Sequence, residues 1–161
     1  MRARTTITAV ALAALPLTAC ASAASAPAVP DTKAAVKVAA VDYLTLYSAG
    51  EWQAAWRLLA PQDQRLAPEA VYAAFHRQCP PEAAGMAYKV EGVMLAGRSG
   101  AVVTYTVPVM EKVYGSATNA MLRTAQGWRV VFDASAVAQY SHGGLEADVK
   151  AAKKAGDCAG G

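Results

Sequence analysis

The spacing of apolar residues predicts helices in the first half of the chain. Apolar side chains recur there every three or four positions, which is the period of a helix with one buried face. Each periodic stretch is flanked by cap-forming residues, glycine or proline, which mark where a helix starts or ends. We therefore expect three helices before residue 80, over residues 31–50, 51–60 and 68–79.

After residue 85 the period of the pattern shortens to two, which indicates strands with one buried face. The turn sequences "GRSG", Tyr114-Gly115 and Gln126-Gly127 separate the alternating stretches at hairpin lengths. Strands joined by such short turns form an antiparallel meander. The four expected strands cover residues 86–96, 101–113, 116–125 and 128–133.

A last helix is expected from Leu145 to Ala155, after a glycine-containing loop and before Gly156. Helices that precede a meander, rather than alternate with strands, predict the α+β class, in which helices cover one face of a sheet. Residues 33–161 are enough for one domain and too few for two. The sequence therefore predicts a single domain of helices packed on an antiparallel sheet.

Alternation assigns the strand residues to an inner and an outer face. No carboxylate and no histidine falls on the expected inner face, which disfavours acid–base catalysis inside the fold. Val93, Leu95 and Val131 fall on the outer face and could form an exposed apolar patch. A slip at Gly92 or Pro108 would exchange the faces of a strand. The residues expected to face inward include Tyr88, Val90, Met94, Val103, Tyr105, Thr118, Ala120, Leu122, Thr124, Trp128 and Val130.

The first 19 residues have the order of an export signal. Two arginines precede an apolar stretch, and small residues follow it. The four residues that end at Cys20, Leu-Thr-Ala-Cys, resemble the bacterial lipobox, which implies cleavage before Cys20 and a diacylglycerol on its thiol. The alternative is ordinary secretion with cleavage near Ala21-Ser22-Ala23, which would remove Cys20. Either route places the protein outside the cytoplasm.

Lipidation would hold the domain on the outer side of the cell membrane. Two acyl chains exceed the marginal hold of one, because each buried methylene contributes about 0.8 kcal/mol. The uncharged stretch near the N-terminus is shorter than the roughly 20 apolar residues of a membrane span. Residues 20–32 are mostly small residues and proline, which cannot bury a core and predict a tether. We therefore expect a lipid-anchored, extracytoplasmic protein with residues 1–19 as signal, 20–32 as tether and 33–161 as the domain.

The chain has three cysteines, an odd number for an oxidising compartment. If Cys20 carries the lipid, Cys79 and Cys158 remain as a pair, and we expect a disulfide between them. The alternative is two free, buried thiols. The disulfide would close a loop of about 80 residues and connect the end of the third helix to the C-terminal tail.

The full chain has 15 basic and 12 acidic residues, and the predicted signal contains two of the basic ones. The remaining charge is nearly balanced, which excludes the strongly basic surface of nucleic-acid-binding proteins. Lys150, Lys153 and Lys154 are typical of the solvated face of a helix. His76 and His142 are far apart and have no cysteine or acid at ligand spacing. We therefore expect no metal, no cofactor and no nucleic-acid partner.

Two stretches, "SAGEWQAAWRLLAP" at residues 48–61 and "GWRVVFD" at residues 127–133, carry a family resemblance. They are similar to the nuclear transport factor 2-like superfamily, which includes ketosteroid isomerase-like proteins, as found in small exported bacterial lipoproteins. The resemblance implies a cone, in which a strongly curved antiparallel sheet wraps around the helices and a pocket opens at its mouth. Members include isomerases, dehydratases, scaffolds and domains with no assigned activity, so the fold does not determine the function.

Aromatic residues are the remaining candidates for a site. Most aromatic side chains at helical or strand spacing belong to a core. In a cone, those near the mouth could hold a small apolar ligand, because such sites are largely hydrophobic with a few polar groups. The candidate pocket residues are Tyr43, Tyr47, Trp56, Tyr88, Tyr105 and Trp128.

The expected function is non-enzymatic, namely a binding or accessory domain for a small apolar ligand or an envelope protein. Asp42 is expected to be exposed, Asp133 to cap a helix after the last strand, and His76 to be a partly exposed helical residue. No catalytic residue is therefore assigned. The alternative is an isomerase or dehydratase of the ketosteroid isomerase type, which requires a carboxylate near Tyr88 or Tyr105 inside a pocket.

Overall fold

The structure is a computed structural model that describes residues 29–81, 84–109 and 112–158. The predicted signal, the lipobox cysteine Cys20 and residues 21–28 of the predicted tether lie outside these ranges. Within the ranges, no helix combines the length and the apolar character needed to cross a bilayer.

The first and last predicted helices are confirmed, with the expected residues at their ends. Thr32 Oγ1 accepts the Ala35 N–H at 3.2 Å at the start of α1, and Gly156 ends α6 with a φ of 81°. The helices of the described residues are α1 (Lys33–Ser48), α2 (Trp52–Trp56), α3 (Pro61–Leu66), α4 (Glu69–Gln78), α5 (Ala134–Gln139) and α6 (Leu145–Ala155).

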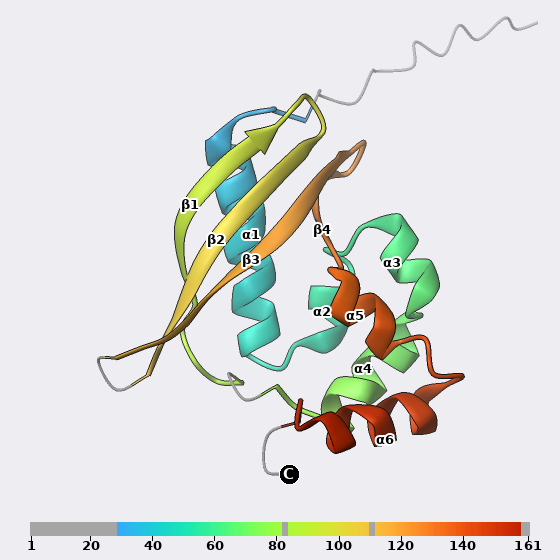
Figure 1. The fold of residues 1–161 in the computed structure, drawn as a ribbon. Helices are drawn as coiled ribbons and strands as arrows, with labels where there is room; N and C mark the ends of the chain where they lie inside the picture. The colour runs from blue at the N-terminus through green and yellow to red at the C-terminus, as the bar shows by residue number, and fades with distance from the viewer. Residues whose placement is uncertain (1–28, 82–83, 110–111, 159–161) are drawn as a thin grey trace, which may run out of the picture.

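The strands form one antiparallel sheet in the order β1-β2-β3-β4, so the predicted meander is confirmed. Helix α1 lies across one face of this sheet and contacts β1, β2 and β4 (Figure 1). The protein is therefore an α+β domain, but the sheet is not strongly curled, unlike the cone that the resemblance implies. The strands are β1 (Lys89–Ala96), β2 (Gly100–Val109), β3 (Lys112–Thr124) and β4 (Gly127–Val131).

The predicted second helix is wrong beyond Trp56. After α2 the chain runs beside β4, where the Ala60 N–H donates to the Val130 carbonyl at 2.7 Å. The Val130 N–H donates in turn to the Leu58 carbonyl at 2.9 Å, so sheet-edge hydrogen bonds replace helical ones. Pro61 then begins α3 rather than ending a helix, because proline is well tolerated at the first helical position.

The turn predicted at Tyr114-Gly115 is also wrong. Strand β2 continues to Val109 and β3 begins at Lys112, so both turn candidates lie inside β3. The glycine lies opposite Val107, and the register shifts between Val107 and Pro108. The two strands keep pairing past the glycine, and their ladder overrides the local turn preference.

The inward face predicted for the third strand is shifted by one residue. Met121 lies opposite Ala101 and is only 2% exposed, and Asn119 lies opposite the buried Val103. Directly opposite residues share one face of a sheet, so this pairing turns Met121 and Asn119 toward α1. The predicted inward residue Ala120 is exposed instead.

A register shift between Val90 and Gly92 exchanges the faces in the second part of β1. Met94, predicted to face inward, is 63% exposed. Val93 and Leu95 pack against the core, so they do not form the predicted outer apolar patch. A slip at Gly92 therefore changes which side chains of this strand are buried.

The predicted disulfide between Cys79 and Cys158 is confirmed. It joins the C-cap of α4 to the residues after α6, and the two helices pack against each other (Figure 1). The core between the helices and the sheet is continuous with this contact. Its largest fully buried side chains are Tyr72, Phe75, Leu59, Val36 and Val103.

Candidate functional site

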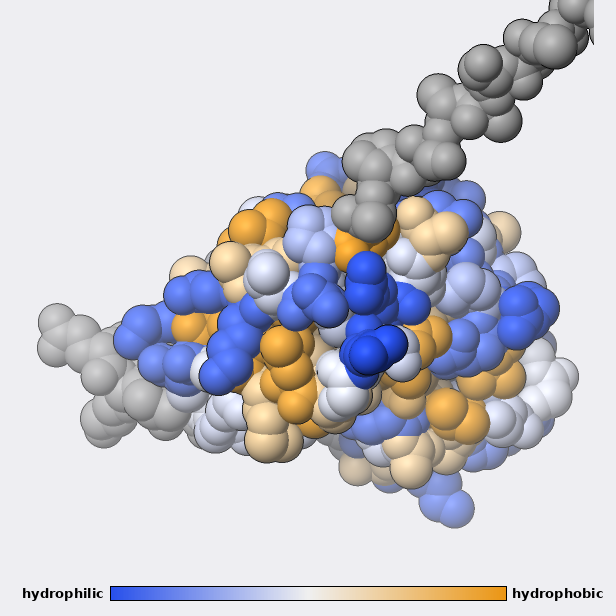
Figure 2. All heavy atoms as spheres, turned by 90° about the horizontal axis from the view of Figure 1, so that it is seen from above, coloured by the Kyte–Doolittle hydropathy of each residue, from blue (hydrophilic) through white to orange (hydrophobic). Residues whose placement is uncertain are grey.

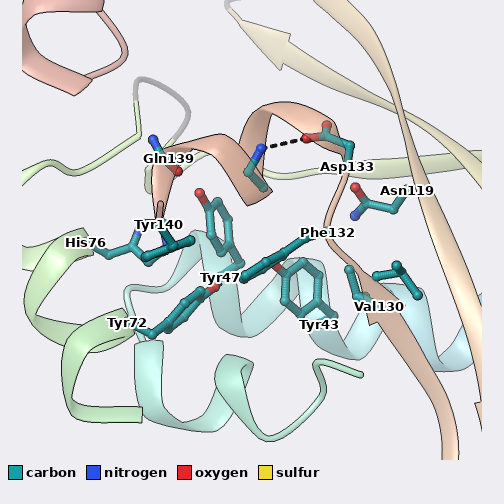
Figure 3. A pocket seen from close by; sticks show the side chains of 12 residues that line it. Tyr43, Tyr47, Tyr72, His76, Asn119, Val130, Phe132, Asp133, Gln139 and Tyr140 are labelled. Atoms are coloured by element: carbon teal, nitrogen blue, oxygen red, sulfur yellow. Dashed lines mark hydrogen bonds between the residues drawn. The ribbon is translucent and has the colours of Figure 1, made fainter. Parts of the chain in front are cut away.

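A small cavity of about 100 Å³ opens between α1, α4, β4 and α5 (Figure 3). Its wall is unusually rich in rings, and we name it the tyrosine cavity after Tyr43, Tyr47, Tyr72, Tyr140 and the adjacent His76. Asn119, Phe132 and Asp133 complete the wall on the sheet side, among other residues.

Helical spacing brings the rings of the tyrosine cavity together. Tyr43 and Tyr47 lie one turn apart on α1, and their rings stack with centroids 5.6 Å apart. Tyr72 and His76 lie one turn apart on α4, with centroids 4.4 Å apart in an edge-to-face contact. Tyr140 follows α5, and its ring stacks on Phe132 at 5.4 Å.

Two hydrogen bonds connect the three helical segments across the cavity. The Tyr43 and Tyr72 hydroxyls lie 3.4 Å apart and join α1 to α4. The Tyr140 hydroxyl lies 3.2 Å from His76 Nε2 and joins the end of α5 to α4. The cavity wall is therefore held by polar contacts inside an aromatic cluster, which restricts the orientation of each ring.

His76 is buried, with 6% of its surface exposed, so the prediction of a partly exposed histidine is wrong. Its ring stacks on Trp52 with centroids 4.9 Å apart. Burial lowers the pKa of His76 to about 4, because desolvation disfavours the charged imidazolium. The side chain is therefore neutral at pH 7.

The second ring nitrogen of His76, Nδ1, is buried and has no hydrogen-bond partner among the described residues. A neutral imidazole carries one donor and one acceptor nitrogen, and Nε2 is already paired with Tyr140. An unsatisfied buried polar atom costs about 1–3 kcal/mol and calls for a missing partner. Nδ1 is therefore a buried, unpaired polar atom of a residue that lines the cavity.

The tyrosines of the cavity are suited to donating hydrogen bonds rather than to acting as bases. Burial raises the pKa of Tyr43, Tyr47 and Tyr72 well above the usual value of a phenol. Burial also raises the pKa of Tyr140. These hydroxyls stay protonated at any physiological pH, and the wall presents neutral donors and acceptors.

Asp133 caps α5, as the sequence predicts. Its Oδ1 accepts the Ala136 N–H at 2.8 Å (Figure 3). The same atom accepts the Ser135 hydroxyl at 2.7 Å. These hydrogen bonds lower the pKa of Asp133, because they stabilise the carboxylate. The same residue also lines the tyrosine cavity, so the cap sets the position of the cavity wall.

The six predicted pocket residues do not gather at one site. Tyr43 and Tyr47 line the tyrosine cavity. Tyr88 lines a separate hollow of about 400 Å³ at the end of α1, and burial raises its pKa to about 12. Tyr105 does not line the tyrosine cavity either, and its ring packs edge-to-face against the Tyr88 ring, with the ring centroids 5.6 Å apart.

The two predicted tryptophans connect loops to the core. Trp56 Nε1 donates to the Ala67 carbonyl at 2.7 Å, between α2 and the end of α3. Trp128 Nε1 donates to the Pro30 carbonyl at 2.8 Å and fixes the chain before α1 to β4. Neither ring lines the tyrosine cavity.

Sequence reasoning missed Tyr72, His76 and Tyr140 as site residues. One signal was present, because Tyr72, Phe75, His76 and Cys79 have the spacing of a complete buried face of α4. A spacing of four alone selects Val71, Phe75 and Cys79 as the buried stripe of this helix and leaves out His76. The contribution of Tyr140 depends on the fold, since α5 brings it back to α4.

The other predicted polar residues lie away from the cavity. Asp42 is exposed on α1, as expected. His142 is largely exposed, and its backbone N–H donates to Asp148 Oδ1 at 2.9 Å. Among the described residues, no three histidine, cysteine or acidic side chains gather at a position that could hold a metal ion.

Comparison of the chain with models of protein families, with curated proteins and with solved structures gave no match.

Proposed function

We propose that this protein is an exported lipoprotein, anchored to the cell membrane through Cys20, whose domain binds a small ligand on the extracytoplasmic side. The lipobox supports the anchor. The Cys79–Cys158 disulfide supports an oxidising location, because such bonds persist mainly outside the cytoplasm. Binding, rather than chemistry, is favoured because the cavity wall consists mainly of neutral, aromatic groups.

The anchor is tested by the intact mass of the protein from the membrane fraction. We expect a chain that begins at Cys20 and carries a diacylglycerol, and we expect the Cys20→Ser variant to lose both the lipid and the membrane association. An unmodified thiol at Cys20, or cleavage beyond it, would contradict the anchor.

The free Nδ1 atom of His76 is the observation that carries the binding proposal. The ligand would have a small apolar body and one neutral hydrogen-bonding group. Because Nδ1 is buried, this group would pair with it only after a neighbouring ring moves aside. A cavity of about 150 Å³ holds benzene. The cavity of about 100 Å³ is smaller but open on one side, so a small ring would enter it in part and extend into the opening. The lining residues include Asp133 and no lysine or arginine, which disfavours an anionic ligand.

Phenol and benzene form a matched pair of probes for this site, because only phenol offers a hydroxyl. We expect phenol to bind roughly threefold to tenfold more tightly than benzene by calorimetry, the gain of one neutral hydrogen bond. In His76→Phe this preference should disappear while benzene binding persists. Equal affinities in the unmodified protein, or no binding of either probe, would contradict the proposal.

An isomerase or dehydratase of the ketosteroid isomerase type is the second candidate. One observation favours it: Asp133 lines the same cavity as Tyr43 and Tyr72, and only its Oδ1 carries hydrogen bonds. A carboxylate base near tyrosine donors is the arrangement that such enzymes need. Turnover of a small ketone that is abolished in Asp133→Asn, a variant that keeps a capping side chain, would favour this candidate over simple binding.

We also propose that the domain is an open member of the nuclear transport factor 2-like superfamily. The two resembling stretches lie side by side, because the Ala60 N–H and the Val130 carbonyl are hydrogen-bonded. Helices before an antiparallel meander agree with that family. A structure of the ligand-bound protein in which the sheet bends around α1 would support membership, and an equally flat sheet would contradict it.

A further inference from the structure

Basic residues gather at the end of the molecule where α1 begins. Five of the thirteen basic residues that follow the predicted signal lie there. Two acidic residues lie among them, Asp31 and Glu91, and Glu91 lines the same hollow as Lys33 and Lys37. After removal of the predicted signal, the rest of the chain holds eight basic and ten acidic residues. Positive charge is therefore in excess at this end, although the net charge of the protein is small. The five basic residues, named here the basic end, are Lys33, Lys37, Arg98, Arg123 and Arg129.

Contacts between the hairpin tips and the start of α1 assemble the basic end. Arg123 Nη1 lies 3.8 Å from Asp31 Oδ2 and donates to the Arg98 carbonyl at 3.4 Å. Strand β4 is fixed to the same place, because Trp128 Nε1 donates to the Pro30 carbonyl. In Figure 1 the β1–β2 tip, the β3–β4 tip and the start of α1 lie at the top, and α6 lies at the opposite end.

An apolar groove adjoins the basic end. Val29, Val38 and Trp128 line it together with one basic and one acidic residue, Arg129 and Asp42, and its volume is about 330 Å³. Val38 is 61% exposed and Val41, one turn of α1 further on, is 42% exposed. Figure 2, which views the molecule from this end, shows strongly hydrophilic and hydrophobic residues side by side. Basic residues beside exposed apolar ones are typical of surfaces that rest on a lipid headgroup layer.

The predicted anchor limits how far this end can lie from the membrane. Nine residue steps separate Cys20 from Val29, and a fully extended chain spans at most about 3.6 Å per residue. The start of the described chain is therefore held within about 30 Å of the bilayer surface. Attraction between exposed charges acts over about 8 Å at physiological salt, so the tether allows contact without enforcing it.

We infer that the basic end docks on the anionic lipid surface to which Cys20 anchors the protein. This inference rests on the proposed anchor. Docking would orient α1 away from the bilayer, since Lys33 lies at its membrane end and Tyr43 and Tyr47 lie further along it. At 1.5 Å per helical residue, the tyrosine cavity would be held about 15–20 Å above the docked surface and open to the aqueous phase.

The processed chain with Cys20→Ser, which carries no lipid, allows docking to be measured separately from anchoring. The probes are vesicles of phosphatidylcholine, alone or with an equal amount of phosphatidylglycerol, and the readout is co-sedimentation at 20 mM and 500 mM salt. We expect binding to the anionic vesicles at low salt and its loss at high salt, because the attraction is screened.

The matched comparison is between two variants that each remove three charges. Lys33→Gln/Lys37→Gln/Arg98→Gln should weaken vesicle binding by at least about tenfold. Lys150→Gln/Lys153→Gln/Lys154→Gln, which changes α6 at the opposite end, should bind like the parent. Equal losses in both variants, or no preference for anionic vesicles, would overturn docking through the basic end. Absence of lipid on Cys20 in the intact mass would instead overturn the anchor alone.

Discussion

At the residue scale, His76 shows how burial sets the chemistry of the site. Its ring lies among Trp52, Tyr47 and Tyr72, and this environment removes the water that would stabilise a charged imidazolium. The nitrogen that binds Tyr140 is satisfied, and the other is not. A neutral histidine with one unpaired nitrogen can offer a hydrogen bond but no charge.

The depressed pKa of His76 predicts a loss of stability in acid. The folded-state pKa of about 4 lies below the ordinary value of 6.5, so the unfolded chain binds the proton first as the pH falls. The free energy of unfolding should therefore be constant above about pH 6.5 and fall by about 2 to 3 kcal/mol by pH 4.5. Urea unfolding of the wild type at pH 7.5 and 4.5 measures this change.

The matched variant for this prediction is His76→Gln, which should lack this part of the pH dependence. Burial raises the pKa of Asp63, which acts in the opposite direction, but both proteins retain Asp63. The difference between their pH dependences therefore isolates His76. Identical slopes between pH 7.5 and 4.5 would show that the histidine remains accessible to protons in the folded state.

At the element scale, α5 is a short helix that depends on its cap. It has six residues and no fully buried side chain, so little packing within the helix stabilises it. Tyr140, which follows it, lines the cavity and binds His76. The cap at Asp133 therefore contributes to the shape of the site as well as to stability.

Replacement of Asp133 by alanine should lower the free energy of unfolding by about 1 kcal/mol, the usual cost of losing a helix cap. The same change should weaken phenol binding, because α5 would no longer hold Tyr140 in place. Asp133→Ser, which keeps a capping oxygen, is the control and should restore most of both. Denaturant titration measures the change in stability, and calorimetry measures phenol binding. Unchanged phenol binding in Asp133→Ala would show that the cap does not support the binding site.

Local signals decided which elements could be predicted from the sequence. Thr32 and Gly156 end α1 and α6 where expected, because caps act through hydrogen bonds within a few residues. Helix α2 ends at Trp56 because the following residues form hydrogen bonds to β4, about 70 residues away. The sequence around Trp56 does not indicate these long-range hydrogen bonds. The same is true of the faces of β1 and β3, which were set by the pairing partners across the ladder.

The candidate site was predictable only in part for the same reason. Tyr43 and Tyr47 follow from the stripe of α1, and His76 follows from the full stripe of α4. Tyr140 lies beyond the last strand, and only the tertiary fold brings it to His76. The sequence therefore predicts aromatic helical faces, and the structure determines which of them meet around a cavity.

At the scale of the whole molecule, the disulfide joins the helical layer to the C-terminal helix. Cys79 and Cys158 are 79 residues apart, and a loop of this length gives about 4 kcal/mol of stabilisation when the loss of chain entropy is the main term. The Cys79→Ser/Cys158→Ser variant should therefore unfold about 4 kcal/mol more easily in denaturant. Reduction of the wild type should give the same loss, and equal stability with and without reductant would contradict a structural role.

The arrangement of the whole molecule separates two tasks along α1. The start of the helix belongs to the basic end, and its last turns supply Tyr43 and Tyr47 to the cavity. An anchored protein with this polarity would present its cavity away from the lipid surface. The disulfide at the far end fixes α6 to α4, and α4 carries the histidine.

We propose that a small neutral ligand in the tyrosine cavity pairs with His76 Nδ1. The most direct measurement is the ¹⁵N resonance of this nitrogen during a phenol titration, with His142, the other histidine of the chain, as internal control. We predict a saturable shift of the His76 resonance and no shift at His142. A His76 Nδ1 resonance that stays unchanged while phenol saturates the protein would contradict the account.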